Sequence, residues 1–160
     1  MWYRLASDMI HPSPEQEQEA ESVIRWAAAR GGVLVVIPVV GGVALLANQI
    51  YMVNRLGQVY AQDLAISSVK GFVMAFAGAL VGQTLAALVP LPFVQIPVAV
   101  TVTYAVGKAA DAWLRDGMPA DYERYRRIFE KAKDFAKQNL GSIKNDPRKD
   151  QPLGDESKKF

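Results

Sequence analysis

The chain has 160 residues, enough for one domain with its own core, and a formal net charge of only +2. Acidic and basic side chains are interleaved, so the single-sign basic surface that nucleic-acid binding requires is not expected. Cysteine is absent, which excludes disulfides, thiolate catalysis and thiolate metal sites.

A long apolar tract, residues 31–107, organises the chain. Only Arg55, Asp63 and Lys70 are charged within it, whereas residues 108–160 hold 13 of the 18 Lys and Arg and 10 of the 16 Asp and Glu. A tract of this kind is buried in a bilayer or in a core that other chains help to cover. Both interpretations stay open from the sequence.

The first helix is predicted over residues 14–30. Ser13 and Gln16 have capping-box spacing and Pro14 suits the first helical position, while residues 31–32, both glycine, are expected to end the helix. Residues 1–12 show no periodic pattern and no apolar stretch long enough for a secretory signal, so they are expected to be a flexible N-terminus.

An interrupted apolar helix is predicted next. A short apolar piece leads to a kink over residues 38–42, and a helix then runs from Val43 to about Gln62. Polar side chains share one face of this second piece, including Asn48, Tyr51 and Arg55. That face either meets water or lines an interior polar seam.

Residues 63–70 are expected to form a polar break, in which Ser67 or Ser68 caps an uncharged helix over residues 71–89. Small residues recur in that helix, and Gly78 and Gly82 form a small-xxx-small pair that favours close helix contact. The candidate packing residues are Gly71, Gly78 and Gly82.

Prolines at positions 90, 92 and 97 predict breaks, and a helix that starts apolar and ends charged follows over residues 98–114. Residues 116–117, Asp-Gly, are expected to end it. One face of this helix carries candidate interaction residues, namely Tyr104, Lys108, Asp111 and Arg115.

The last helix, residues 119–140, is predicted to be amphipathic, with Tyr122, Tyr125 and Phe129 on its apolar stripe. It either docks on the helical body or binds a membrane surface or a partner helix. Its polar face mixes acids and bases, so attraction to anionic lipid should be weak. Residues 142–160 have few apolar side chains and are predicted to be a disordered tail.

No catalytic constellation is present in the sequence. A phosphate-binding loop, a dinucleotide fingerprint, a nucleophile elbow and a histidine pair are all missing. Asp63 is the only acid between Glu21 and Asp111, so the apolar tract offers no carboxylate pair for acid–base chemistry. The chain is therefore expected to be non-enzymatic and to bind no cofactor or metal.

Three segments resemble a family of GTPase-associated proteins of unknown function, numbered 697. They are residues 47–60 (ANQIYMVNRLGQVY), residues 90–92 (PLP) and residues 101–108 (TVTYAVGK), within a match over roughly residues 33–117. The matching positions are Met52, Leu56, Tyr60, Thr103, Tyr104, Ala105 and Gly107. Family members often carry glycine at the position of Ala61, and some have an attached GTPase domain, which the present sequence is not expected to contain. The resemblance implies an all-helical apolar hairpin and a small GTPase partner, and supplies no catalytic residues.

Together these features predict an all-α fold: an apolar helical hairpin or small bundle, forming a single domain over residues 13–141. The predicted function is a membrane-associated scaffold or anchor for a small GTPase, with spans near residues 33–53 and 71–89. The positive-inside rule places the C-terminus in the cytoplasm, at the bacterial inner membrane. The alternative is a soluble, cytoplasmic all-α interaction module that buries its apolar helices by homo-oligomerisation.

Overall fold

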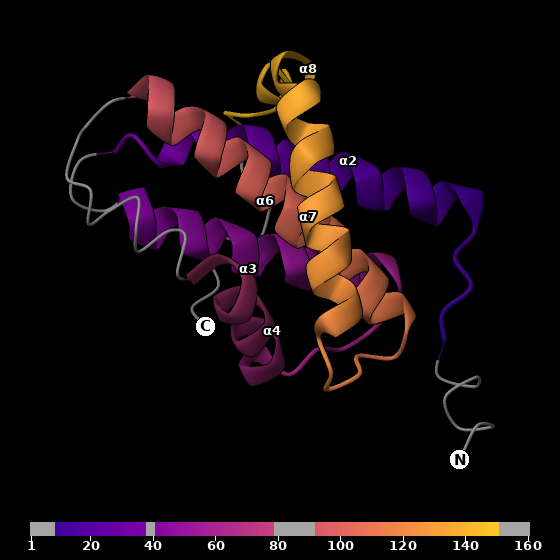
Figure 1. Ribbon diagram of the computed structural model, residues 1–160. Helices are drawn as coiled ribbons and strands as arrows, with labels where there is room; N and C mark the ends of the chain where they lie inside the picture. The colour runs from indigo at the N-terminus through magenta and orange to yellow at the C-terminus, as the bar shows by residue number, and fades with distance from the viewer. Residues whose placement is uncertain (1–8, 38–40, 79–91, 151–160) are drawn as a thin grey trace.

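The computed structural model describes residues 9–37, 41–78 and 92–150, and all regular secondary structure in these ranges is helical. The prediction of an all-α fold is therefore confirmed (Figure 1). The helices are α2 (Pro14–Leu34), α3 (Gly41–Val59), α4 (Ile66–Val73) with a π-helical turn (Met74–Gly78), α6 (Pro92–Arg115), α7 (Glu123–Gln138) and α8 (Leu140–Lys144).

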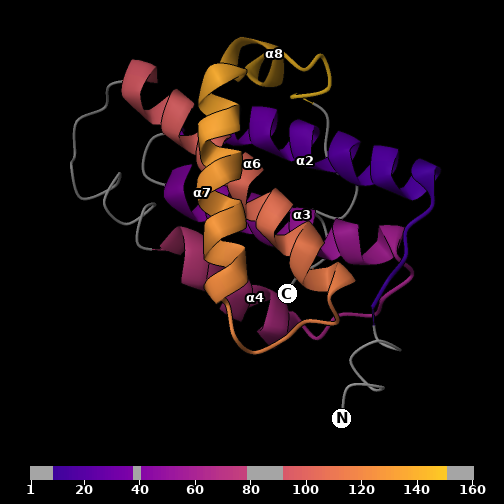
Figure 2. The same ribbon diagram turned by 45° about the vertical axis from the view of Figure 1, so that its right-hand side comes forward.

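The helices α2, α3 and α6 form the centre of the bundle. Helix α2 packs along both α3 and α6, and α7 crosses over α6 on one side, as Figures 1 and 2 show. Helix α8 contacts α2, while α4 and the π-helical turn lie against α3 and α6. The core therefore lies between α2, α3 and α6 and extends beneath α7 and α4.

The start of α2 confirms the predicted capping box. The Ser13 hydroxyl accepts a hydrogen bond from the Gln16 N–H at 3.2 Å, and the Gln16 side chain accepts one from the Ser13 N–H at 2.9 Å. These reciprocal bonds satisfy two backbone donors that the first helical turn leaves open.

The predicted end of α2 is wrong, because the helix continues through Gly31 and Gly32 to Leu34. Both glycines are buried against neighbouring helices. A Cβ on Gly32 would lie 2.8 Å from Val100 Cγ2 of α6. These glycines therefore allow close helix contact, and the tertiary packing outweighs their low helix propensity.

The break between α3 and α4 is shorter than predicted. Helix α3 ends at Val59, and α4 already begins at Ile66. The N-cap of α4 is Ala65, which has no side-chain hydrogen bond, so Ser67 and Ser68 lie in the first turn instead of capping it. The helix predicted over residues 71–89 changes to π-helical geometry at Met74, and residues 79–89 lie outside the described ranges.

Pro97 lies inside α6, so the predicted helix start at residue 98 is also wrong. The missing N–H of proline removes one backbone hydrogen bond, close to the start of a helix of 24 residues. The Thr101 hydroxyl donates to the Pro97 carbonyl at 2.8 Å. The predicted end of this helix is correct, since α6 stops at Arg115 and Gly117 follows with φ of 84°.

The C-terminal region differs from its prediction in three ways. Helix α7 begins at Glu123, after Pro119, and ends at Gln138, while Gly141 lies within α8. The segment predicted to be disordered from residue 142 is folded at least as far as residue 150, because Ile143 is fully buried and Arg148 is bonded to Ser22. Residues 151–160 lie outside the described ranges.

Among the helices described, none is both long enough and apolar enough to cross a bilayer. The first expected span, residues 33–53, is divided between α2 and α3. The second, residues 71–89, begins in α4 and then passes into residues that the structure does not describe.

Candidate functional site

The three central helices share one end that lacks charge. Helix α2 carries its charged residues before residue 31, whereas α3 carries its single charge at Arg55 and α6 carries its charges after Gly107. The end of α2 and the starts of α3 and α6 lie side by side at the left of Figure 1. Charge is therefore separated along the axis of the bundle, and we name the uncharged side the apolar end.

Large apolar side chains are exposed at this apolar end. Val43 is 71% exposed and Val94 is 49% exposed, although both are branched aliphatic residues that ordinarily lie inside proteins. Five exposed large hydrophobic residues of the described ranges gather here: Val33, Val36, Ile37, Val43 and Val94. Exposed apolar patches of this kind typically mark a surface that another molecule covers.

A cavity of about 240 Å³ opens beside the apolar end, between α2, α6 and the segment that follows α7. Its apolar wall contains Val33, Val36 and Ile96, and its polar side is formed by Lys144 and Lys149. These lysines belong to the segment predicted to be disordered, so sequence reasoning missed them. The one local signal was Ile143, an apolar residue in a charged stretch, which is fully buried.

Arg148 fixes the segment that carries the two lysines. Its guanidinium donates to the Ser22 hydroxyl at 2.6 Å and pairs with Asp146 at 2.9 Å, and it lies 5.4 Å from the centre of the Trp26 ring. Hydrogen bonds from Arg148 lower the pKa of the Asp146 carboxyl, which favours its ionised form. Residues 145–149 are thereby attached to α2.

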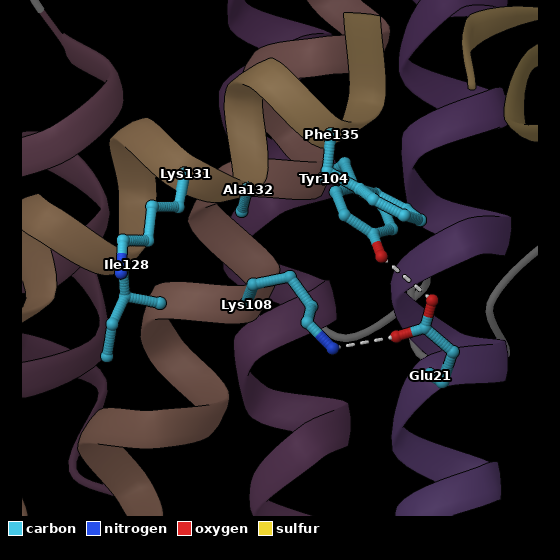
Figure 3. A pocket seen from close by; sticks show the side chains of 7 residues that line it. All are labelled: Glu21, Tyr104, Lys108, Ile128, Lys131, Ala132 and Phe135. Atoms are coloured by element: carbon cyan, nitrogen blue, oxygen red, sulfur yellow. Dashed lines mark hydrogen bonds and ion pairs between the residues drawn. The ribbon is translucent and has the colours of Figure 1, made fainter. Parts of the chain in front are cut away.

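A second hollow, of about 470 Å³, lies between α2, α6 and α7 (Figure 3). Glu21 of α2 accepts hydrogen bonds from the Tyr104 hydroxyl at 2.9 Å and from Lys108 Nζ at 3.0 Å, both on α6. The Tyr104 ring stacks on Phe135 of α7, with centroids 5.7 Å apart. Figure 3 shows Ile128 and Lys131 of α7 on the side of the hollow opposite Glu21.

Glu21 is kept ionised by its neighbours. Burial raises its pKa. The charge of Lys108 and the hydrogen bonds from Lys108, Tyr104 and Arg25 together lower the pKa by more than burial raises it, so the net shift is downward. Burial also raises the pKa of Tyr104, and the adjacent Glu21 carboxylate adds to this effect. The predicted face residues Tyr104 and Lys108 therefore act together to join α6 to α2.

The other two predicted residues of that face, Asp111 and Arg115, form a network at the charged end. Arg115 pairs with Asp111 at 3.0 Å and with Glu17 at 3.4 Å, and it donates to the Tyr60 hydroxyl at 3.2 Å. The Tyr60 hydroxyl in turn donates to Asp111. The network links the ends of α3 and α6 to the start of α2, so its evident role is structural.

The predicted polar face of α3 divides between interior and surface. Asn48 is buried and donates to the Ala27 carbonyl at 2.8 Å, and Tyr51 is also buried, whereas Arg55 is partly exposed and pairs with Gln58. The sequence missed Gln49, which is fully buried and donates to the Thr103 hydroxyl at 3.2 Å. An interior polar seam thus crosses the core between α2, α3 and α6.

Among the described glycines, the close contacts between helices fall at positions that the sequence did not single out for packing. No described residue of another helix lies within 4 Å of where a Cβ of Gly71 would be, so the packing role of Gly71 stays a prediction. The structure describes only the backbone of Gly78, and Gly82 lies outside the described ranges. Close contacts between helices occur at Gly31, at Gly32 and at Gly107, where a Cβ would lie 2.8 Å from Ile24 Cγ2.

Helix α7 docks on the helical body through its predicted stripe. Tyr125 and Phe129 are buried and Tyr122 is partly buried. Tyr122 and Phe129 join a cluster of aromatic rings with Phe72, Phe76 and Trp113, in which neighbouring centroids lie 4.5–6.3 Å apart. The apolar stripe of α7 is therefore covered by other residues of the same chain.

No group of three or more potential metal-ligating side chains (His, Cys, Asp or Glu) occurs in the described ranges. Comparison with known proteins finds no matching family model, no matching curated protein and no matching solved structure. The resemblance to family 697 thus stays a prediction, and the geometry of the chain itself is what supports a function.

Proposed function

We propose that the chain is a non-enzymatic helical scaffold that attaches to a membrane surface through its apolar end. The observation that carries this proposal is the group of exposed valine and isoleucine side chains where the uncharged ends of α2, α3 and α6 meet. A helical body with one apolar end can insert that end into the interfacial region of a bilayer while its charged end stays in water.

Several features support surface attachment over binding of a small substrate at the apolar end. The exposed large hydrophobic residues described there are all aliphatic, and the residues that line the adjoining cavity include no carboxylate, histidine or hydroxyl group. The stripe of α7 is used in internal packing and the Glu21 cluster in joining α2 to α6, whereas Val43 and Val94 of the apolar end stay exposed. Attachment would present the charged end, with α7, to partners.

The test is sedimentation with phospholipid vesicles. The variant Val43→Asp/Val94→Asp places two charges at exposed positions, so it should fold normally and lose most vesicle binding. Ile66→Asp is the matched control, because Ile66 is 39% exposed at the start of α4, where an acidic residue is tolerated. Equal binding by all three proteins would contradict attachment through the apolar end.

The competing proposal is that further copies of this chain cover the apolar end. In that case light scattering would show an oligomer in the absence of lipid, and Val43→Asp/Val94→Asp would dissociate it. A monomer that binds vesicles supports the membrane proposal. Alkaline carbonate extraction of cell membranes then distinguishes surface attachment from integral insertion, because a surface-attached chain is released and an integral one is retained.

The resemblance to family 697 adds a small GTPase as the proposed partner, at the cytoplasmic face of the membrane. This part of the proposal depends on the matching residues, such as Met52, Tyr60 and Gly107, and not on an observed contact. Affinity capture with the purified chain, in the presence of GDP and of a non-hydrolysable GTP analogue, should recover a GTPase in one nucleotide state. Capture of none in either state would contradict it.

A further inference from the structure

The cavity beside the apolar end combines an apolar wall with two cations. Val33 and Val36 belong both to the cavity and to the exposed apolar end, so the two surfaces are continuous. Lys144 and Lys149 line the same cavity. A ligand bound here would meet aliphatic side chains and positive charge at once.

Within the described ranges, the two lysines differ from the neighbouring Arg148 in having no anionic partner. Arg148 is engaged by Asp146, Ser22 and the Trp26 ring, whereas neither lysine forms an ion pair with any residue that the structure describes. Arg148 attaches the segment to α2 through Ser22, and these contacts of Arg148 hold the two lysines near the cavity. Their ammonium groups are therefore available to an external anion.

We propose that this cavity binds the phosphate headgroup of an anionic phospholipid. Lys144 and Lys149 supply the charge for the phosphate, and Val33, Val36 and Ile96 contact the adjoining glycerol and upper acyl region. This inference rests on the proposed attachment of the apolar end to a membrane. It adds selectivity, because the aliphatic residues alone would not distinguish one phospholipid from another.

The position of the lysines is what favours a lipid over free phosphate. Lysine acts as a point charge for phosphate, and it is enriched where a protein meets a bilayer because its aliphatic stem can follow the apolar surface. A free phosphate ion would gain nothing from the valine and isoleucine wall. Because that wall is continuous with the apolar end, we expect the headgroup of a lipid there to lie next to the two lysines.

The experiment compares vesicles of phosphatidylcholine alone with vesicles that also contain phosphatidylglycerol. The wild-type chain should bind the mixed vesicles more tightly. Lys144→Gln/Lys149→Gln should lose this gain, by about fivefold for each lysine, while its binding to phosphatidylcholine alone is unchanged. Arg127→Gln/Lys131→Gln is the matched control, since it removes two exposed charges from α7, which contributes no residue to the cavity.

The possible results separate the two proposals. If the wild-type chain binds neither kind of vesicle, membrane attachment itself is wrong. If it binds both equally, or if the control loses as much affinity as the lysine variant, attachment stands and the headgroup site is overturned. If inorganic phosphate binds the chain without vesicles and displaces it from mixed vesicles at constant ionic strength, the site takes free phosphate, which also overturns the lipid proposal.

Discussion

Ala61, after the end of α3, has the left-handed backbone conformation that Gly117 has after the end of α6, with φ values of 52° and 84°. In both places the next residue donates its N–H to the carbonyl five positions earlier, at 2.8 Å after Ala61 and 2.9 Å after Gly117. This is the Schellman arrangement, in which glycine is favoured because a Cβ destabilises the left-handed conformation.

We therefore expect Ala61→Gly to stabilise the chain. Relief of the left-handed conformation is worth about 1–2 kcal/mol, and the greater freedom of glycine in the unfolded chain offsets part of it, which leaves a gain of about 0.5–1 kcal/mol. Gly117→Ala should lose about 1 kcal/mol for the same reason. Urea unfolding measures both changes, and Gly141→Ala is a control with open space around its Cβ. A loss of stability in Ala61→Gly would contradict the cap assignment.

A second prediction concerns the glycines between α2 and α6. A Cβ on Gly107 would lie within 3.0 Å of Ile24 and Met52, and one on Gly32 would lie 2.8 Å from Val100. Gly107→Ala and Gly32→Ala should each destabilise the chain by about 1–3 kcal/mol, because the core must shift to admit the methyl group. Gly71→Ala should instead stabilise by up to about 1 kcal/mol, since its Cβ meets open space in a helix. Thermal unfolding of the three variants tests this order.

For Gly78 and Gly82, close contact between helices stays a prediction of the sequence. Replacement of both by leucine should then disrupt folding or assembly. If the double variant keeps the thermal stability and the molecular mass in solution of the wild-type chain, the predicted close contact is wrong.

A third prediction is a loss of stability in alkali. Burial raises the pKa of Tyr60, Tyr104 and Tyr125, and in each case a carboxylate that accepts the hydroxyl hydrogen bond raises it further. The folded chain therefore holds these protons more tightly than the unfolded chain. Their contribution is fully present below the unfolded tyrosine pKa of about 10 and is lost as the pH rises above it. Unfolding free energies measured from pH 8 upward should decrease above about pH 10, and less steeply in Tyr60→Phe.

A fourth prediction concerns Glu21 in acid. Its pKa is lowered in the folded chain, so the stability that it contributes is present above its unfolded pKa, near 4.5, and is lost as the pH falls through the folded value. Glu21→Gln should reduce the slope of stability against pH in this acidic range. Because Glu21 and Lys108 side chains are about one-third exposed, the loss at neutral pH should stay near 1 kcal/mol or less. Lys108→Met should reduce the acid slope in the same way, and an unchanged slope in both variants would contradict the pairing.

Local features of the sequence predicted the fold well where the signal lies within a few residues. The capping box at Ser13 and the helix end at Gly117 were correct, because each depends on hydrogen bonds between near neighbours in the chain. The predicted end of α2 and the predicted start of α6 were wrong, because they relied on Gly31, Gly32 and Pro97. The effect of these residues on helix continuity depends on what packs against them and on their position in the helix. The packing role of Gly71 stays a prediction, because small size favours close contact only where another helix is present, and no described residue of another helix lies near its Cβ position.

The candidate site was less predictable than the fold. The sequence alone shows that charge is separated along α2, α3 and α6, and that one end of each of these helices is apolar. The cavity that Val36 and Lys149 both line could not be predicted from the sequence, because it joins residues more than one hundred positions apart. Lys144 and Lys149 were assigned to a disordered tail, since a short charged segment is ordered only by the contacts of Ile143 and Arg148 with the helical body.

By itself, the sequence determined that this chain is helical, where several helices start and stop, and that charge and apolar surface are separated along it. These properties follow from short-range hydrogen bonding, side-chain shape and periodicity. Only the tertiary structure decided which glycines admit a neighbouring helix, that α7 covers α6, and that two lysines stand beside the apolar end. Those outcomes depend on long-range packing, in which residues far apart in the chain share one core and one surface.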